Sequence, residues 1–290
     1  MQPVVDTPRW FSDALAAPSE PREVRLADGT RIEARYWGAE GSPPLVLIHG
    51  NGAHIGWWSF LAPFFADRFR VAALSLSGMG GSSWRQRYDM ARFADEIRTV
   101  APAANAGPQQ PILIGHSMGG FPAILAATSD WPVRALIMVD VALAGVQPID
   151  VKPYSGHQIY ATREAALARF RLAPAQPCEN RFILRHLAKM AIQPSAEGGW
   201  TWRFDPALWS KIDFGGVWEA MPRVRCPVAM IRGALSPLTS PKMIAAIQAA
   251  LPRSAPLITI PEAHHHVMID QPLALVAAID SLIETWAPDA

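Results

Sequence analysis

Short, mostly apolar runs recur along this chain of 290 residues, and they constrain its fold more than any other feature. The runs are Leu45–Ile48, Val71–Leu74, Ile112–Ile114, Ala135–Val139, Val228–Ile231 and Leu257–Ile260. Strands that are covered on both faces have this composition, because neither face needs polar side chains. Amphipathic stretches lie between the runs, such as the i, i+3, i+4, i+7 apolar repeat that begins at Met90. The alternation predicts an α/β fold with a mostly parallel, twisted sheet and helices on both faces.

Local signals add a hairpin and two further helices to this pattern. Glu23–Leu26 and Arg31–Tyr36 alternate polar and apolar residues and flank Asp28-Gly29, a dipeptide typical of tight hairpin turns. We expect a helix over Phe121–Thr128 and a closing helix over Leu273–Trp286, where the preceding proline suits a first helical position.

The strand pattern stops between about residues 145 and 222. This interval is rich in Arg, Ala, Pro and Trp and contains two helix-like stretches, Thr162–Leu172 and Glu179–Ile192. The sequence therefore predicts a core built from residues 1–144 and 223–290 and an inserted helical cap over 145–222. A long ordered loop is the alternative, and loops of this length are uncommon.

Composition limits the partners and the compartment. Half of the residues are apolar, 18% are charged and the net charge is +1, with no basic run, so neither nucleic acid nor an anionic membrane is expected as a partner. The first residues are not typical of a signal peptide, and no stretch of about 18 apolar residues occurs, so we expect neither a signal peptide nor a membrane-spanning helix. The two cysteines lack metal-like spacing, which favours a reducing cytoplasm. Oligomeric state is left open.

Gly115-His-Ser-Met-Gly119 is the strongest chemical signal in the chain. It matches G-x-S-x-G, follows an apolar run and precedes a helix-like stretch, which is the context this motif requires. Ser117 would occupy a tight strand-to-helix turn with its hydroxyl projecting, and the flanking glycines let neighbouring backbone pass without Cβ clashes. A glycine-rich phosphate loop is the alternative, but the G-K-[ST] pattern is missing. Ser117 is therefore the candidate nucleophile.

A second glycine-rich loop, His49-Gly-Asn-Gly52, closes the strand Leu45–Ile48. Such a loop can supply one backbone N–H to an oxyanion hole, and the residue after the nucleophile supplies the other. We assign these donors to Asn51 and Met118. An ordinary glycine-rich turn is the alternative.

Three successive histidines, His264 to His266, follow the strand Leu257–Ile260. A base for Ser117 should come last in the chain, in such a loop, as a neutral imidazole that accepts the hydroxyl proton. A metal site is the alternative, but adjacent loop side chains rarely converge on one ion, so no metal is expected.

A carboxylate should orient this histidine, and two positions are possible for it. One is Asp140, at the end of the strand Ala135–Val139; the other lies after the next strand, in Arg232–Pro237, where Ser236 stands and no acid occurs. Asp140 is chosen by elimination, with capping of the following turn as its alternative role. Asp270 also lies near the histidines, but it is expected to cap the last helix.

With these motifs the chain resembles the α/β-hydrolase superfamily, over nearly its whole length from about residue 22. The matching segments are His49–Gly52, Leu76–Ser82, Gly115–Gly120 and His264–Pro272. In relatives the catalytic histidine stands seven positions before the proline of the last segment, and this spacing selects His265. Two departures stand out: no acid follows Ile231, and Met79 replaces the histidine that relatives carry in a G-H-G loop.

The resemblance and the serine together predict a hydrolase of a carboxylic ester or lactone that acts through an acyl-enzyme on a small molecule, with no cofactor. Dehalogenases and epoxide hydrolases of the superfamily use aspartate in place of Ser117, which disfavours those chemistries. Three alternatives keep the triad: C–C bond hydrolysis, peptide cleavage at an N-terminal proline, and a cofactor-free lyase reaction. A non-catalytic ligand-binding protein on the same scaffold is a further alternative.

Tryptophans are the candidates for the substrate pocket. Trp57 and Trp58 from the first loop and Trp202 from the predicted cap are assigned to an apolar or aromatic acyl pocket. Packing between cap and core is their alternative role.

Overall fold

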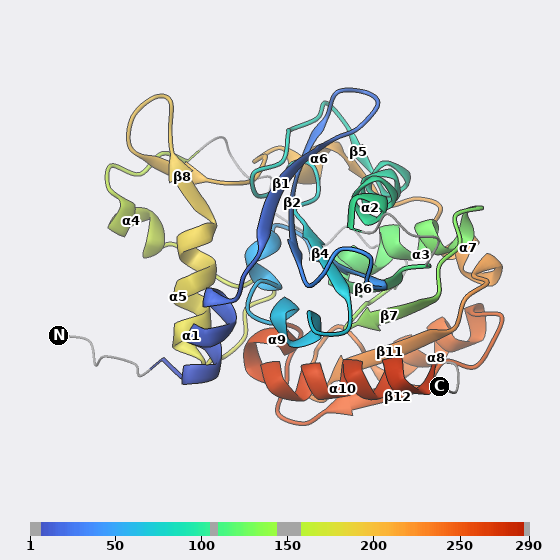
Figure 1. Ribbon diagram of the computed structural model, residues 1–290. Helices are drawn as coiled ribbons and strands as arrows, with labels where there is room; N and C mark the ends of the chain where they lie inside the picture. The colour runs from blue at the N-terminus through green and yellow to red at the C-terminus, as the bar shows by residue number, and fades with distance from the viewer. Residues whose placement is uncertain (1–6, 105–109, 144–157, 287–290) are drawn as a thin grey trace.

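The computed structural model describes residues 7–104, 110–143 and 158–286 and contains an eight-stranded central sheet (Figure 1). Its strands are β1 (Glu20–Arg25), β2 (Arg31–Trp37), β3 (Pro44–Ile48), β4 (Arg70–Leu74), β6 (Ile112–His116), β7 (Ala135–Val139), β11 (Val228–Gly233) and β12 (Leu257–Ile260). They lie in the order β1-β2-β4-β3-β6-β7-β11-β12. The pairs β1–β2 and β2–β4 are antiparallel, and every pair from β4 to β12 is parallel. The predicted fold class is confirmed.

The apolar runs form the strands of the parallel part, and most of them are buried on both faces. Every residue of β3, β4, β6 and β7 is buried, whereas the edge strand β12 leaves Leu257 exposed. The predicted hairpin is also present: β1 pairs with β2, and Gly29 takes a left-handed φ of +83° in the turn. A left-handed turn of this kind strongly favours glycine, as the Asp-Gly signal indicates.

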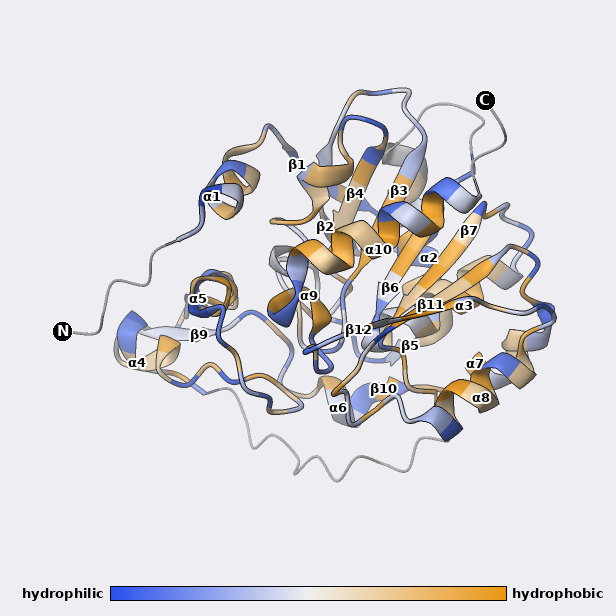
Figure 2. Cartoon of the chain, turned by 90° about the horizontal axis from the view of Figure 1, so that it is seen from below, coloured by the Kyte–Doolittle hydropathy of each residue, from blue (hydrophilic) through white to orange (hydrophobic). Residues whose placement is uncertain are grey.

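Two helical layers cover the sheet, and successive strand residues point to opposite layers. Val46 packs into one core with residues of α2, α3, α7 and α8, whereas Leu47 packs into the other with residues of α1, α5, α9 and α10. The first layer comprises α2 (Met90–Ala104), α3 (Gly120–Thr128), α7 (Val217–Ala220) and α8 (Pro241–Ala250). The second comprises α1 (Arg9–Ala16), α5 (Arg181–Met190), α9 (Val267–Asp270) and α10 (Pro272–Thr285). Figure 2 shows mostly hydrophobic central strands beneath α10.

In the described part of the chain four 3₁₀ helices join these elements, and one of them directly follows β6. They are η1 (Ile55–Trp57), η2 (Ala62–Phe65), η3 (Ser117–Gly119) and η4 (Met221–Arg223). Within the described residues, no helix has the length and apolar character needed to cross a membrane.

The segment predicted as a cap contains short helices and also short strands, which the sequence does not predict. Besides α5 and α7 it holds α4 (Arg163–Leu167), α6 (Leu208–Lys211), β8 (Ile192–Pro194), β9 (Trp200–Trp202) and β10 (Ile212–Asp213). β8 pairs with β9, and β10 pairs with β5 (Tyr88–Asp89) of the core. Strands of two or three residues are too short to produce a readable alternation. Residues 145–157 of this segment lie outside the described residues, and its boundaries stay a prediction.

Candidate active site

Ser117 occupies a strained turn between β6 and α3. Its φ is +51°, in the left-handed region that side chains other than glycine rarely adopt, and its side chain is partly exposed. A Cβ added to Gly119 would lie 2.4 Å from the His49 carbonyl oxygen, and one added to Gly115 would lie 2.6 Å from the Gly119 carbonyl oxygen. The two glycines of the motif are therefore required by backbone contacts, as the sequence predicts.

A histidine from the far end of the chain meets this serine. His265 lies in the loop after β12 and is 2% exposed. Its Nε2 is 2.9 Å from Ser117 Oγ, and its Nδ1 is 2.9 Å from Asp140 Oδ1. The structure thus brings together Ser117, Asp140 and His265, which follow β6, β7 and β12 at the carboxyl ends of the parallel strands, with β11 between the last two.

Asp140 is fully buried, and hydrogen bonds hold its carboxylate. It accepts from the Gly233 backbone N–H at 2.8 Å, from the Ser236 hydroxyl at 2.6 Å and from the Thr239 hydroxyl at 3.1 Å, in addition to His265. From the sequence, Ser236 is predicted only to occupy a position where an acid is missing, and Thr239 is not predicted to belong to the site. Both donors lie in the loop after β11, so a pair of hydroxyls after this strand is the signal that would have identified them.

These contacts define the tautomer of His265. An ionised carboxylate only accepts hydrogen bonds, so the proton of a neutral His265 imidazole sits on Nδ1 and points to Asp140. Nε2 then carries the lone pair that accepts the Ser117 hydroxyl proton. This is the arrangement that general-base activation of a serine requires.

The loop after β3 lies directly against the nucleophile turn. A Cβ on Gly50 would come 3.0 Å from His116 Nδ1 and 3.1 Å from Ser117 Cβ, so a larger residue here would need these side chains to shift by a few tenths of an ångström. His49 fixes the loop: its Nδ1 lies 2.7 Å from the Gly50 carbonyl oxygen, and its Nε2 accepts from the Leu76 N–H at 3.0 Å. Asn51 follows in this loop and Met118 follows Ser117, so both predicted oxyanion donors stand next to the turn that carries the nucleophile.

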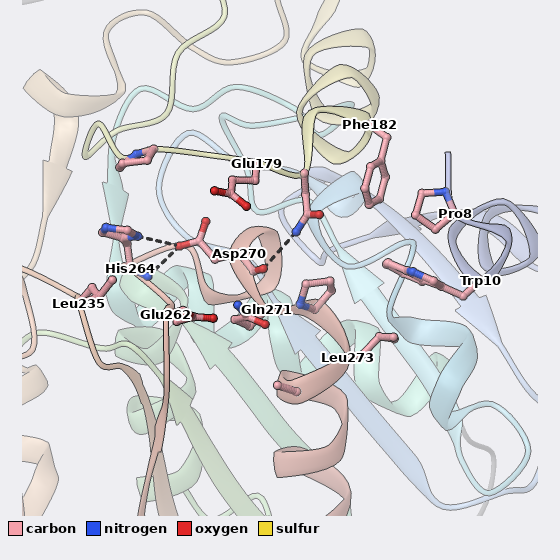
Figure 3. A pocket seen from close by; sticks show the side chains of 14 residues that line it. Pro8, Trp10, Glu179, Phe182, Leu235, Glu262, His264, Asp270, Gln271 and Leu273 are labelled. Atoms are coloured by element: carbon pink, nitrogen blue, oxygen red, sulfur yellow. Dashed lines mark hydrogen bonds and ion pairs between the residues drawn. The ribbon is translucent and has the colours of Figure 1, made fainter. Parts of the chain in front are cut away.

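The three successive histidines have different surroundings. His264 Nδ1 is 3.0 Å from Asp270 Oδ2, and its backbone N–H donates to the same oxygen at 2.7 Å (Figure 3). The expected capping role of Asp270 is wrong, since Gln271 is the N-cap residue of α10 and Asp270 instead binds His264 and Gln176. His266 turns inward, with its ring 4.8 Å from that of His265.

Two further buried histidine rings adjoin His265. His116, directly before the nucleophile, directs Nε2 to the His265 carbonyl oxygen at 3.0 Å. Burial lowers the pKa of His116 well below its usual range and that of His266 to about 3, and the charge of His265 adds to both effects. Both rings therefore stay neutral at physiological pH. His116 is not predicted from the sequence to belong to the site.

The predicted pocket tryptophans lie in three different settings. The Trp57 ring is stacked with the His116 ring, with 6.3 Å between centroids, and meets the His266 ring edge-on at 5.0 Å. Trp57 therefore packs against these two histidines. Trp58 has no exposed surface and belongs to the core beneath α10, so its assignment to a pocket wall is not supported by its position. The Trp202 ring packs against Tyr160 and Phe204, within the predicted cap.

A cleft of about 600 Å³ adjoins the site between α1, the segment before α5 and the start of α10 (Figure 3). His264 and Asp270 line it, together with the carboxylates of Glu179 and Glu262. Ser117, His265 and Asp140 are not among its lining residues, so this cleft does not contain the hydrogen-bonded serine.

Comparison with known proteins gives a consistent result. Residues 45–279 match the model of the alpha/beta hydrolase family. The esterase Rv0045c of Mycobacterium tuberculosis is 25% identical over 279 residues, covering 91% of this chain and 90% of its own. The crystal structure of this same esterase superposes with a TM-score of 0.75 at 22% identity, covering 97% and 99% of the two chains. A thioesterase domain from the curacin biosynthetic pathway gives 0.74 at 24% identity, covering 90% and 99%.

Proposed function

Because the chain belongs to the alpha/beta hydrolase family, we propose that it hydrolyses carboxylic esters with Ser117 as the nucleophile. The observation that carries the proposal is the continuous hydrogen-bonded chain from Asp140 through His265 to the partly exposed Ser117 hydroxyl. The mycobacterial esterase that resembles this chain over nine-tenths of its length supports the choice of ester bonds.

In the proposed reaction, Ser117 Oγ attacks the ester carbonyl carbon while His265 Nε2 takes the hydroxyl proton. The backbone N–H groups of Asn51 and Met118 bind the oxyanion. Collapse of the tetrahedral intermediate breaks the C–O bond, and His265 returns its proton to the leaving alkoxide. Water then attacks the acyl-enzyme, again with His265 as base, and releases the acid. Asp140 holds the imidazole and stabilises its charged form throughout, so the reaction needs no cofactor or metal.

The proposed substrate is a small ester or lactone with an apolar or aromatic part. This proposal extends the sequence prediction of an apolar acyl pocket. Aromatic side chains of the predicted cap pack against the helix after Ser117: Phe121 meets Phe214 edge-on at 6.0 Å, and Phe214 lies 6.0 Å from Trp209. Both partners come from the predicted cap. A cytoplasmic location is part of the proposal, in keeping with the two free cysteines, Cys178 and Cys226.

The test is hydrolysis of chromogenic esters of graded acyl length by the wild type and by Ser117→Ala. We expect turnover by the wild type and background rates for the variant, since an alanine cannot form the acyl-enzyme. Equal turnover by both proteins would refute Ser117 as nucleophile. Absence of turnover with every ester would refute the esterase proposal in favour of C–C hydrolysis, N-terminal proline cleavage, a lyase reaction or ligand binding alone. A fluorophosphonate probe, which labels an activated serine without turnover, separates the three enzymes from the binding protein.

A further inference from the structure

The loop that carries His265 is held through its backbone on both sides of this residue. Before it, the His264 N–H donates to Asp270 Oδ2 at 2.7 Å. After it, the His266 N–H donates to Gln176 Oε1 at 2.9 Å. Buried backbone N–H groups need acceptors, and in a loop the side chains that supply them help to define where the loop lies. The position of His265 therefore depends on Asp270 and Gln176.

Gln176 comes from a different part of the chain than the loop it contacts. It stands 90 residues before His266, in the segment that precedes α5 and within the predicted cap. Its amide bridges two partners, because Nε2 donates to Asp270 Oδ1 at 2.9 Å and to Oδ2 at 3.0 Å while Oε1 accepts from His266. Asp270 Oδ2 in turn accepts from His264 (Figure 3). One side chain of the predicted cap is thus connected to the backbone before and after His265.

The two partners together require an amide at position 176. A backbone N–H only donates and an ionised carboxylate only accepts, so the Gln176 oxygen faces His266 and the NH₂ group faces Asp270. A glutamate would set a second carboxylate against Asp270. An apolar side chain would leave the N–H of His266, a residue that is 3% exposed, without this acceptor.

A second residue fastens the same segment to the end of the histidine loop. Asn180 Nδ2 donates to the backbone carbonyl oxygens of Ile269 at 2.7 Å and Asp270 at 3.1 Å. The segment 176–180 therefore contacts the loop next to His265 and again at the end of α9. Two separate attachments hold the segment in place, which allows Gln176 to fix the loop.

Small displacements of this loop matter because the imidazole has to meet two partners at once. His265 Nδ1 lies 2.9 Å from Asp140 Oδ1, and Nε2 lies 2.9 Å from Ser117 Oγ. Both are hydrogen-bond distances, and a shift of the backbone lengthens one or both of them. Displacement of a reacting group by about 1 Å can lower a rate by about 10²-fold.

We propose that Gln176 is a positioning residue for His265. Through the His266 N–H and through Asp270 it holds the loop so that His265 Nε2 meets the Ser117 hydroxyl. In this way the predicted cap supplies part of the alignment on which the reaction depends. The inference rests on the proposed function, since it takes His265 as the base of Ser117. Its test therefore includes a reaction of Ser117 that needs no ester substrate.

The first test is the rate at which a fluorophosphonate labels Ser117 in the full chain, in the wild type and in Gln176→Met. Methionine keeps the length of the side chain but lacks the amide. We expect labelling to slow by about tenfold to 10²-fold, and kcat for a chromogenic ester to fall by the same factor with KM within about twofold. Gln248→Met is the matched control, because this glutamine donates to the Ala255 carbonyl oxygen, outside the histidine loop, and should label at the wild-type rate. Circular dichroism verifies that both variants are folded.

The second test restores the pairing with donor and acceptor exchanged. Gln176→Glu alone places a carboxylate oxygen where Nε2 lies 2.9 Å from Asp270 Oδ1, and labelling should be slow. When Asp270→Asn is added, the new NH₂ group can donate to the carboxylate at position 176 while the new amide oxygen accepts from the His264 N–H. Labelling by the double variant should recover to within about threefold of the wild-type rate. Asp270→Asn alone leaves the bond of Gln176 to His266 in place and should label at close to the wild-type rate.

Labelling of folded Gln176→Met within about twofold of the wild-type rate overturns the proposal. A double variant that labels no faster than Gln176→Glu alone also overturns it. A wild type that labels but hydrolyses no ester refutes the esterase proposal only, because the labelling rates still decide the role of Gln176. A wild type that does neither overturns both, since it has no activated Ser117 for His265 to serve.

Discussion

Replacing Asp140 with asparagine is the sharpest test of how the triad is oriented. The substitution keeps the size of the side chain but changes one acceptor into a donor. Oδ2 accepts from the Gly233 backbone N–H, which cannot rotate, so the asparagine oxygen should take that place. The amide NH₂ then faces His265 Nδ1, where Asp140 Oδ1 stands in the wild type. His265 must accept there, its proton moves to Nε2, and Ser117 loses its base.

The expected loss of kcat/KM follows from what it costs the variant to keep the proton of His265 on Nδ1. Turning the amide over sets NH₂ against the Gly233 N–H and leaves a buried donor unpaired, at about 2–3 kcal/mol. Losing the carboxylate beside the imidazolium removes a charge-assisted hydrogen bond worth about 1.5–3 kcal/mol. Together they raise the barrier by about 3.5–6 kcal/mol, and we expect kcat/KM to fall by roughly 400- to 25,000-fold.

The assay is steady-state hydrolysis of the best chromogenic ester, with thermal unfolding recorded in parallel. Asp270→Asn is the control, because this carboxylate also accepts from a histidine Nδ1, that of His264, but lies outside the triad. The control should retain most of the wild-type kcat/KM. A loss of less than about tenfold in a folded Asp140→Asn protein, equivalent to about 1.4 kcal/mol, would refute the tautomer argument.

Two further predictions concern stability. Gly119→Ala should lower the free energy of unfolding by about 1–3 kcal/mol or more, because its Cβ would lie 2.4 Å from the His49 carbonyl oxygen; urea unfolding measures this. Gly215→Ala, which meets only the flexible Asp213 side chain, is the control, and equal midpoints for both variants would contradict the packing argument. Burial lowers the pKa of His49 to about 4 and of His54 to about 3, so only the unfolded chain takes up these protons as pH falls below about 6.5. The free energy of unfolding should therefore be highest above pH 6.5 and fall toward pH 4 by up to about 1.4 kcal/mol per pH unit for each histidine. His54→Asn should make this dependence on pH less steep. An unchanged slope in the variant would contradict the assignment of the effect to His54.

The sequence predicts the sheet well because the information is local. A run such as Ala135–Val139 can be buried on both faces only as a central strand, and all five of its residues are buried. The turn at Ser117 is also predicted from the sequence, because its two glycines are part of a recognisable motif. Gly115 lies close to the backbone of Gly119, and Gly119 lies close to the backbone of the loop after β3. The placement of Asp140 beside His265 followed from the absence of an acid after β11, and the structure brings these two side chains together.

The rest depends on packing between distant segments. Nothing in the sequence near Trp58 distinguishes a pocket wall from a core, because an aromatic residue suits both, and its full burial appears only once α10 covers the sheet. His116, whose ring adjoins His265, is one variable position within G-x-S-x-G. Its contact with His265 arises across 149 residues and leaves no trace in local periodicity.

The spacing of the triad along the chain also bears on how the protein acquires activity. The bonds of His265 to Asp140 and Ser117 close loops of 125 and 148 residues, and β12, which precedes His265, is the last strand and an edge of the sheet. Contacts of such long range form slowly, because the chain must lose much of its freedom before they become favourable. Regain of hydrolysis during refolding therefore records the docking of the C-terminal strand and not the earlier collapse of the core.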